Sequence, residues 1–313
     1  MRRIVSVSIG SSTRDHKAVI NVLGEDFSIE RIGTDGDMQK AKDLFKELDG
    51  KATVFGMGGI GMYFWGGQRR FTMREAKPIA RIPKITPMVD GSGAKNTLER
   101  RTIEYLAQHE PEMFRGKKVL LTCAVDRFGM AQALHELDCE VLYGDFIFIL
   151  GLPIPIYNLK VLEKIVAVLA PIVVQAPYHW LYPVGSEQEK PPTGNKYRKY
   201  YEWADIIAGD YLQIRKYMLD DMTGKTIITN TVTPEDVEFM RQRNVRELIT
   251  TTPNFAGRSF GTNAVEALMV ALLNKPISEI TPDDYYRIID EIGYVPRREQ
   301  LAESAGKRSE VIA

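Results

Sequence analysis

Apolar and polar positions along the first 115 residues follow two periods, one typical of strands and the other of helices. The short apolar or alternating runs that predict strands cover residues 4–9, 19–23, 28–32, 52–55 and 86–89. Apolar side chains three or four positions apart predict helices over residues 37–48 and 96–108. Because strands and helices alternate, this part of the chain is predicted to form an α/β domain of its own.

From residue 117 onward the alternation of strand and helix becomes more regular. Strands are predicted over residues 118–124, 140–145, 171–175, 204–210, 225–231 and 246–253. Helices are predicted over residues 129–137, 158–169, 211–219, 262–273 and 278–292. A further helix is predicted to begin at Pro234, with Thr233 as its N-cap. Repeated strand–helix steps of this kind predict a doubly wound, mostly parallel sheet.

These patterns together predict an α/β fold with two α/β domains, the second of them a Rossmann-like sheet. We expect a substrate domain over residues 1–115 and a dinucleotide-binding domain over residues 116–275. A C-terminal helix with a polar, frayed tail is expected over residues 276–313. A proline- and tyrosine-rich segment over residues 176–203 is too long for a simple connection, and such loops are usually functional or disordered.

The composition is ordinary for a globular protein, because 44% of the residues are apolar and 41 basic residues balance 41 acidic ones. A net charge of zero gives no reason to expect a nucleic-acid partner or an anionic membrane surface. The two cysteines, Cys123 and Cys139, lie in apolar strand contexts and indicate buried thiols in a reducing compartment. We therefore expect a cytoplasmic location.

The most hydrophobic stretch, from Phe146 to Pro177, is the candidate for a membrane segment. Glu163, Lys164 and several prolines interrupt it, so it lacks the roughly 18–20 uncharged residues that a spanning helix needs. We predict no membrane association. The stretch fits either a buried core or a subunit interface, and the second alternative predicts a homodimer.

The segment Lys118–Asp145 has the order of parts of a dinucleotide-binding unit: strand, tight turn, helix, strand and a closing carboxylate. The turn lacks the first two glycines of the G-x-G-x-x-G pattern, but Gly129 can serve close helix–strand packing. Asp126 can cap the helix while Arg127 supplies positive charge to a pyrophosphate. Asp145 can accept hydrogen bonds from ribose hydroxyls, so the expected cofactor is NAD or NADP, with NAD favoured. The alternative is an ordinary strand–helix turn in which Asp126 serves only as the N-cap.

Threonines end two predicted strands, at Thr229 and Thr250, on the carboxyl edge where ligands of open α/β sheets bind. They can contact the ribose or the nicotinamide amide, although threonine is also simply a good strand former.

Arg258 and a Gly-Thr-Asn turn that contains Thr262 precede a helix. Exposed N–H groups and a guanidinium there can hold a carboxylate or phosphate of the ligand. The alternative is a capped helix with Arg258 in a surface ion pair.

Lys95 and Asp90 are the candidate catalytic pair, since a lysine close to a strand-end aspartate can transfer a proton at a carbinol carbon. The alternative is an N-capped helix start with a solvated lysine.

The segment Gly10–His16 can also bind an anion, and His16 is the histidine best placed for acid–base chemistry. Neither an H-x-x-x-H nor a C-x-x-C spacing occurs, so no metal site is expected.

Several segments make the chain resemble bacterial proteins labelled quinate 5-dehydrogenase, within the quinate/shikimate dehydrogenase class. They include SVSIGSSTRDH, VDGSGAKNTLERR, TCAVDRFGMAQAL and LITTTPNFAGRSFGTNAVEA, and the likeness spans nearly all of residues 1–275. The resemblance implies a substrate domain followed by a cofactor domain, and it implies that Asn96 and Thr97 contact a polyol substrate. The chain departs from the class at the catalytic lysine and aspartate motifs and at the glycine-rich loop.

The main function predicted from the sequence is therefore an NAD(P)-dependent oxidoreductase of quinate/shikimate dehydrogenase type. Such an enzyme moves a hydride between nicotinamide and a small hydroxylated carboxylic acid. One alternative is a non-enzymatic small-ligand-binding or regulatory protein that keeps the Rossmann-like fold. Another is a transferase that uses a nucleotide or a sugar phosphate and grips the phosphate with Arg258 and the turn that follows it.

Overall fold

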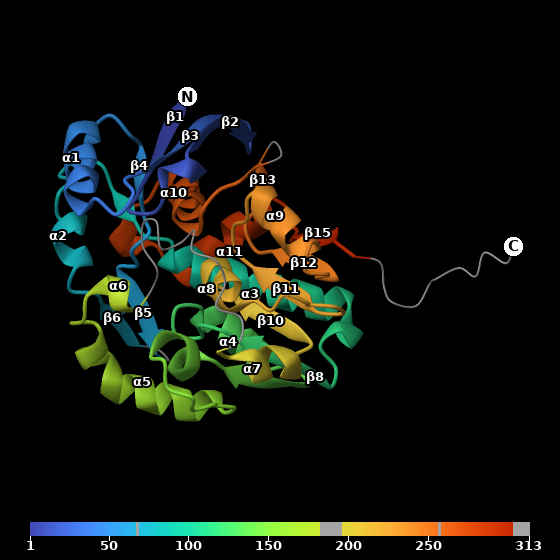
Figure 1. The fold of residues 1–313 in the computed structure, drawn as a ribbon. Coiled ribbons are helices and arrows are strands. Elements are labelled where there is room, and N and C mark those ends of the chain that lie inside the picture. Colours follow the sequence, from blue (N-terminus) through green and yellow to red (C-terminus); the bar gives the residue numbers. More distant parts are fainter. Residues whose placement is uncertain (67–68, 182–195, 256–257, 303–313) are drawn as a thin grey trace, which may run out of the picture.

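The computed structural model describes residues 1–66, 69–181, 196–255 and 258–302. The chain forms two lobes, each built around its own sheet and covered by helices (Figure 1). Most strand pairs in the two sheets are parallel. The predicted α/β fold with two α/β domains is therefore confirmed.

The first lobe contains a five-stranded sheet in the order β2-β3-β1-β4-β7. Strand β2 pairs antiparallel with β3, and the other pairs are parallel. The strands are β1 (Arg2–Ser8), β2 (His16–Val22), β3 (Glu25–Gly33), β4 (Val54–Gly58) and β7 (Met88–Val89). Because four of them point the same way, the residues that follow β1, β3, β4 and β7 gather at one edge of the sheet.

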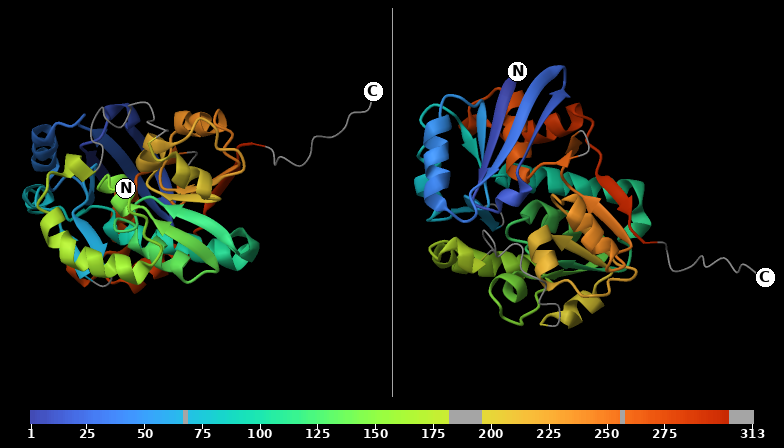
Figure 2. Two further views of the ribbon diagram at one scale, coloured as in Figure 1. Left: turned by 60° about the horizontal axis from the view of Figure 1, so that its bottom comes forward. Right: turned by 45° about the horizontal axis from the view of Figure 1, so that its top comes forward.

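Successive residues of β1 pack on opposite faces of this sheet, as the period of a strand requires. Ile4 belongs to the core formed with α10 and α11, whereas Val5 belongs to the core formed with α1 and α2. Figure 2 shows the orange-red helix α10 beside the blue strands of this lobe. The helices are α1 (Met38–Leu48), α2 (Ala76–Ala80), α10 (Thr262–Leu273) and α11 (Pro282–Glu291).

The second lobe contains a six-stranded sheet in the order β15-β12-β11-β10-β8-β9. All pairs are parallel except β12 with β15. Sequence order reverses between β8 and β10, and the crevice at such a reversal is the usual ligand site of an open α/β sheet. The strands are β8 (Lys117–Leu121), β9 (Cys139–Tyr143), β10 (Ile206–Gly209), β11 (Thr226–Thr229), β12 (Glu247–Thr250) and β15 (Arg297–Gln300).

Helices cover both faces of the second sheet. Leu121 packs with α4 and α5, whereas Leu120 packs with α7, α8 and α9. These helices are α4 (Phe128–His135), α5 (Leu159–Val173), α7 (Arg198–Trp203), α8 (Tyr211–Tyr217) and α9 (Pro234–Arg241). Helix α3 (Ser92–His109) joins the lobes, because its Leu98 packs in the first core and its Ile103 packs in the second.

The remaining elements are short. They are η1 (Ser12–Arg14), β5 (Tyr63–Gly66), β6 (Arg69–Thr72), η2 (Pro111–Met113), η3 (Asp145–Ile149), α6 (Tyr178–Leu181), β13 (Asn254–Phe255), β14 (Arg258–Ser259) and η5 (Ile277–Glu279). Of the proline- and tyrosine-rich segment, residues 182–195 lie outside the described residues. Within the described part of the chain, no helix has the combination of length and apolar composition that crossing a membrane requires.

Residues 171–175, predicted as a strand, do not form one, because helix α5 continues to Val173. The reason is the buried face of this helix, on which Leu162, Val166 and Ala170 lie four residues apart. A run of branched residues suggested a strand locally, but packing along the helix determines the outcome.

The hydrophobic stretch that includes α5 is only partly a core. Val168 and Ile172 on the outer face of α5 are each 71% exposed. Exposed apolar residues on one helix face are compatible with a subunit interface. The homodimer therefore stays a prediction.

Two segments lie in other places than the sequence suggested. Helix α10, placed by the sequence in the domain 116–275, packs against β1, β4 and β7 of the first sheet. Residues 297–300, expected at the start of a frayed tail, form β15 and pair with β12. The Arg298 guanidinium donates to Glu247 at 2.9 Å across this pair. The chain thus passes between the lobes more often than two successive domains would require.

Candidate functional site

The carboxyl edges of the two sheets meet at a cavity of about 670 Å³. In the first lobe, Ser8, Gly58 and Asp90 line it at the ends of β1, β4 and β7. In the second lobe, Asp210 and Asn230 line it directly after β10 and β11. Ligand pockets usually enclose about 300–1,000 Å³, so this cavity has the size for a small molecule.

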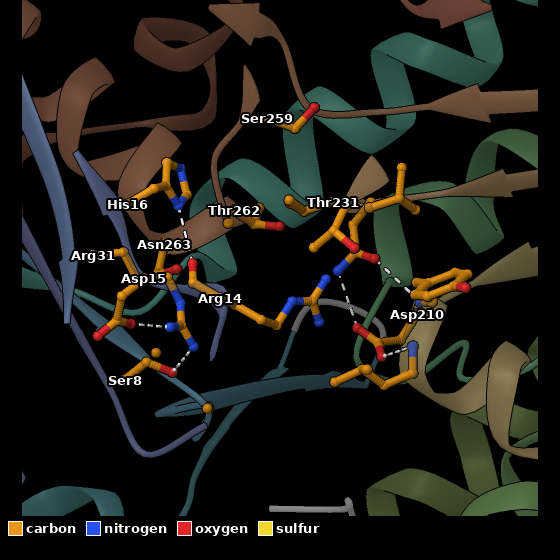
Figure 3. Close-up of a pocket in the computed structure, with 18 of the residues that line it drawn as sticks. Ser8, Arg14, Asp15, His16, Arg31, Asp210, Thr231, Ser259, Thr262 and Asn263 are labelled. Atoms are coloured by element: carbon orange, nitrogen blue, oxygen red, sulfur yellow. Dashed lines mark hydrogen bonds and ion pairs between the residues drawn. The ribbon is translucent and has the colours of Figure 1, made fainter. Parts of the chain in front are cut away.

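Arg31 on β3 provides a positive charge that is held firmly at the cavity wall (Figure 3). Its guanidinium donates to Asp15 Oδ1 at 2.5 Å and to the carbonyl oxygen of Ser11 at 2.9 Å. It also donates to Ser8 Oγ at 3.2 Å. Burial lowers the pKa of Arg31, and the neighbouring Asp15 carboxylate opposes that shift.

Arg14 in η1 connects the two lobes across the cavity. Figure 3 shows its side chain extending from the side of His16 toward that of Asp210. The Arg14 guanidinium contacts Asp236 Oδ2 on α9 at 3.1 Å. The His16 ring stacks on Phe260, with the ring centroids 4.4 Å apart.

Lys95 and Asp90, the predicted catalytic pair, both line the cavity, but each has its own partner. Lys95 Nζ lies 2.8 Å and 3.0 Å from the two carboxylate oxygens of Asp126. Burial alone would lower the pKa of Lys95, but the Asp126 carboxylate raises it above its ordinary value. Asp90 accepts from the backbone N–H groups of Met62 at 2.5 Å and Tyr63 at 3.1 Å. A shared proton-transfer role for Lys95 and Asp90 stays a prediction.

The turn expected to hold a pyrophosphate is occupied by a carboxylate of the chain itself. Asp145 accepts from the backbone N–H groups of Ala124 at 3.0 Å and Val125 at 2.9 Å. Burial raises the pKa of Asp145 to about 6, and these N–H groups oppose the shift. A Cβ at Gly129 would lie 2.0 Å from the carbonyl oxygen of Asn96 on α3. Asp145 therefore has structural partners where a ribose was expected, and Gly129 permits close packing, here against the helix α3.

Arg127 points into the protein and not into the cavity, because its side chain is fully buried. The guanidinium forms an ion pair with Glu99 on α3 and lies 3.0 Å from Asp210 Oδ2 at the start of α8. Burial alone would lower the pKa of Arg127, but the adjacent Glu99 carboxylate holds it well above its ordinary value. Of the predicted cofactor residues, Asp126 is the one that lines the cavity.

The predicted threonine contacts are mostly structural. Thr229 donates to the carbonyl oxygen of Gly209 at 2.8 Å, and the side chain of Thr250 is fully buried away from the cavity lining. Thr97 donates to the carbonyl oxygen of Gly93 one helical turn earlier, at 2.8 Å. Among these predicted contacts, Thr262 is the threonine that lines the cavity.

Two further predicted substrate residues have different outcomes. Asn96 packs its backbone carbonyl against α4 and is not among the residues that line the cavity. Arg258 belongs to β14, but its side chain lies outside the described part of the structure. Its role as an anion ligand stays a prediction.

The sequence did not single out several residues that form the cavity. Arg31, Asp210, Asn230 and Asn263 line it from both lobes, as does Arg14 of the segment Gly10–His16 predicted to bind an anion. Asp210 and Asn230 lie at the ends of predicted strands, so the strand-end rule that selected Thr229 and Thr250 was able to find them. Arg31 lies inside a strand, and no local pattern marks it.

The buried carboxyl group of Glu266 on α10, close to Asp90 of the cavity wall, predicts a stability that depends on pH. Burial raises the pKa of Glu266 on α10 to about 7, and the neighbouring Asp90 carboxylate adds to the shift. A raised folded-state pKa means that stability is fully present below about pH 4.5 and is lost as the pH rises toward 7. A shift of this size corresponds to about 3 kcal/mol. The Glu266→Gln protein is therefore expected to lose much of the wild-type decline in stability between pH 5 and 8.

Urea denaturation of both proteins at the two pH values measures this difference. Tyr285 donates to Glu266 at 2.7 Å and can still donate to the amide oxygen. Glu279→Gln changes an exposed carboxyl and serves as the control. Equal pH dependence of the Glu266→Gln protein and the wild type would show that Glu266 does not titrate in this range.

Comparison with known proteins gives two family matches and a set of distantly similar structures. Residues 93–301 match the family described as Domain of unknown function (DUF8754), and residues 3–90 match Domain of unknown function (DUF8753). No curated protein matches the sequence.

Three solved structures illustrate the structural likeness. An ABC transporter solute-binding protein from Burkholderia multivorans is 10% identical, with a TM-score of 0.36 and 87% of this chain and 92% of that chain covered. A periplasmic ABC transporter solute-binding protein from Actinobacillus succinogenes with bound D-allose is 9% identical, with a TM-score of 0.35 and coverages of 96% and 98%. A Mycobacterium smegmatis protein in complex with β-D-fucofuranose is 9% identical, with a TM-score of 0.32 and coverages of 96% and 99%. At these TM-scores the likeness transfers no ligand to the present chain.

These findings correct the identity and function predicted from the sequence. The two family models that match are domains of unknown function and not quinate or shikimate dehydrogenases, and no curated protein matches. The predicted NAD(P)-dependent oxidoreductase of that type is therefore wrong. The physical reason lies in the turn after β8, where the Asp145 carboxylate takes the N–H groups that a pyrophosphate needs. NAD or NADP as a ligand stays a prediction, although N–H groups of the turn expected to hold its pyrophosphate donate to Asp145.

The predicted cytoplasmic location is contradicted as well: the Actinobacillus structure to which the chain is similar is described as a periplasmic solute-binding protein.

The boundary between the two family matches coincides with the start of α3, where the chain leaves the first sheet. The longer match covers the whole second lobe and also the helices α10 and α11 that return to the first. The chain therefore belongs to the family described as Domain of unknown function (DUF8754).

Proposed function

We propose that the protein binds a small, polyhydroxylated molecule in the cavity between its two lobes. The observation that supports this most is the meeting of two carboxyl sheet edges at one cavity of about 670 Å³. Strand ends at such an edge present side chains and backbone groups that have no partner within the sheet. Two facing edges can therefore enclose a ligand from opposite sides.

The chemistry of the lining favours a ligand rich in hydroxyl groups. Carboxylates such as Asp90 and Asp210 offer acceptors, whereas Arg31, Asn263 and Thr262 offer donors. A hydroxyl group both donates and accepts, so a polyol satisfies a wall of mixed character better than an apolar ligand does. Most of the charged groups already form ion pairs, which holds them in place before a ligand arrives.

The test uses a glycine at the cavity wall. A Cβ at Gly61 meets no heavy atom closer than 3.9 Å, so the wall accepts a methyl group there at ordinary van der Waals distances. Gly61→Phe is expected to fill part of the cavity, whereas Gly61→Ala adds one methyl group and serves as the matched control. Thermal-shift and calorimetric titrations are run with monosaccharides, polyols, sugar acids and sugar phosphates, and with amino acids as comparison compounds.

At least one polyhydroxylated compound is expected to stabilise the wild type, by about 2.7 kcal/mol at a concentration of 100 times its Kd. The Gly61→Ala protein is expected to respond in the same way, and the Gly61→Phe protein is expected to lose the response. A panel without any binder, or equal binding by the Gly61→Phe protein, would contradict the proposal.

A further inference from the structure

The start of helix α10 forms one corner of the cavity and has donor groups left over. Gly261, Thr262 and Asn263 all line the cavity, and Gly261 is the N-cap. A glycine has no side chain with which to cap a helix, and no side-chain cap bond is present here. The N–H of Ala264 donates to the Gly261 carbonyl oxygen at 2.9 Å, whereas no acceptor within the helix faces the N–H groups of Thr262 and Asn263. The helix dipole places positive potential at them.

Two buried hydroxyls at the same corner also lack partners. Thr262 and Ser259 line the cavity and are only 5% and 8% exposed. Among the described residues, neither Thr262 Oγ1 nor Ser259 Oγ has a hydrogen-bond partner. Buried hydroxyls are normally satisfied, so two unsatisfied ones beside a helix start indicate a missing acceptor.

The positive charge of Arg31 near this corner favours an anion as that acceptor. The Arg31 guanidinium donates to Ser8 Oγ at 3.2 Å. The side chains of Ser8 and Asn263 both pack against Gly58, because a Cβ at Gly58 would lie 3.0 Å from the first and 3.1 Å from the second. Figure 3 shows Thr262, Asn263, His16 and Arg31 on the same side of the cavity.

Two carboxylates of this lobe also line the cavity, and donors of the fold hold each of them in place. Asp15 accepts from Arg31 and from the backbone N–H of Gly33. Asp90 accepts from three backbone N–H groups, those of Met62, Tyr63 and Ser92. The hydroxyls of Thr262 and Ser259, in contrast, have no hydrogen-bond partner among the described residues.

Close packing keeps the helix start in one position. A Cβ at Gly56 would lie 2.8 Å from the carbonyl oxygen of Asn263, and one at Gly91 would lie 2.9 Å from its backbone nitrogen. Gly91 also has a φ of +92°, a conformation that favours glycine. Asn263 Nδ2 donates to Ser6 Oγ at 2.6 Å. The donors are thus placed before any ligand binds.

We propose that the start of α10, with the hydroxyls of Thr262 and Ser259, is an oxyanion subsite that holds the phosphate or carboxylate group of the ligand. This rests on the proposed function, because it names the acidic group of the molecule bound in the same cavity. The hydroxyls and the helix N–H groups donate hydrogen bonds to the oxyanion, and Arg31 supplies the countercharge.

Inorganic phosphate is the probe for this subsite, with sodium acetate as a second arm and sodium chloride at equal ionic strength as the reference. The wild type, Thr262→Val and Ser259→Ala are compared by calorimetric titration and thermal shift. Thr34→Val is the matched control, since Thr34 is also buried with an unpartnered hydroxyl in this lobe but does not line the cavity.

Phosphate or acetate is expected to raise the Tm of the wild type above that in sodium chloride, and the tighter of the two identifies the acidic group. Thr262→Val and Ser259→Ala are each expected to raise the Kd for that anion by about tenfold, the effect of one lost charge-assisted hydrogen bond. Thr34→Val is expected to bind like the wild type.

An anion response no larger than that of sodium chloride would overturn the subsite, and so would unchanged affinity in both cavity variants. If neutral sugars bind and Gly61→Phe blocks them while phosphate and acetate have no effect, the subsite fails and the proposed function stands. If the anion binds in an α10-dependent way while no polyhydroxylated molecule does, the proposed function fails in its ligand class.

Discussion

Replacing Arg127 by methionine is expected to lower the free energy of unfolding by about 3–5 kcal/mol, the range measured when one partner of a buried ion pair is removed. The Arg127 and Glu99 side chains are both fully buried, so the remaining Glu99 carboxylate would be left without its ion-pair partner and without water. Asp210 would lose the guanidinium as well, but it keeps its hydrogen bond from Asn230 at 3.0 Å.

Urea denaturation followed by circular dichroism measures this loss. The matched control is Arg100→Met, which removes a more exposed arginine from α3 that pairs with Glu104 and Glu136. Such pairs contribute about 0–1 kcal/mol. A double variant, Arg127→Met with Glu99→Leu, is expected to regain part of the stability because it removes the orphaned charge too. A loss in Arg127→Met no larger than in Arg100→Met would contradict the buried pair.

Replacing Gly129 by alanine is expected to destabilise the protein by at least about 1–3 kcal/mol, the usual cost of overpacking, or to prevent folding. The added Cβ would lie 2.0 Å from the carbonyl oxygen of Asn96, and this oxygen belongs to the backbone of α3. A backbone atom inside a helix cannot rotate away, so α3 and α4 would have to separate.

The yield of folded protein and the Tm of the Gly129→Ala variant are compared with those of Gly61→Ala. Gly61 also gains one methyl group, but its nearest neighbour would lie 3.9 Å away, an ordinary contact, so its variant is expected to keep the wild-type Tm. If the two alanine variants are equally stable, the close contact between α3 and α4 is not present in solution.

The sequence was sufficient for the elements and for the class of fold, because both depend on local periodicity. The helix predicted over 262–273 and the strands around Val119 and Ile228 appear where their apolar periods indicate. The segment 171–175 shows the limit of this reasoning, since branched residues favour a strand locally but one face of α5 is buried. The separate strand β15 was missed because all four of its residues are polar and give no apolar alternation.

The sequence predicted the site less well, because the same residue types serve ligands and the fold alike. An aspartate 16 residues after Gly129 fits a ribose ligand by spacing, yet Asp145 binds the backbone of the preceding turn. Arg127 had the charge for a pyrophosphate, but Glu99 from α3 pairs with it. Both alternatives satisfy the local pattern, and contacts from elements 20 or more residues away separate them.

By itself, then, the sequence determined that strands and helices alternate, that two sheets form, and that Lys95, Asp90, Asp126 and Thr262 lie near strand ends or helix starts. Only the tertiary structure decided that α10 returns to the first lobe and brings Thr262 to the same cavity as Arg31. Periodicity is a property of neighbouring residues, whereas a binding cavity is made by residues hundreds of positions apart. The contact of Arg14 with Asp236 across the cavity, 222 residues apart, is of this second kind.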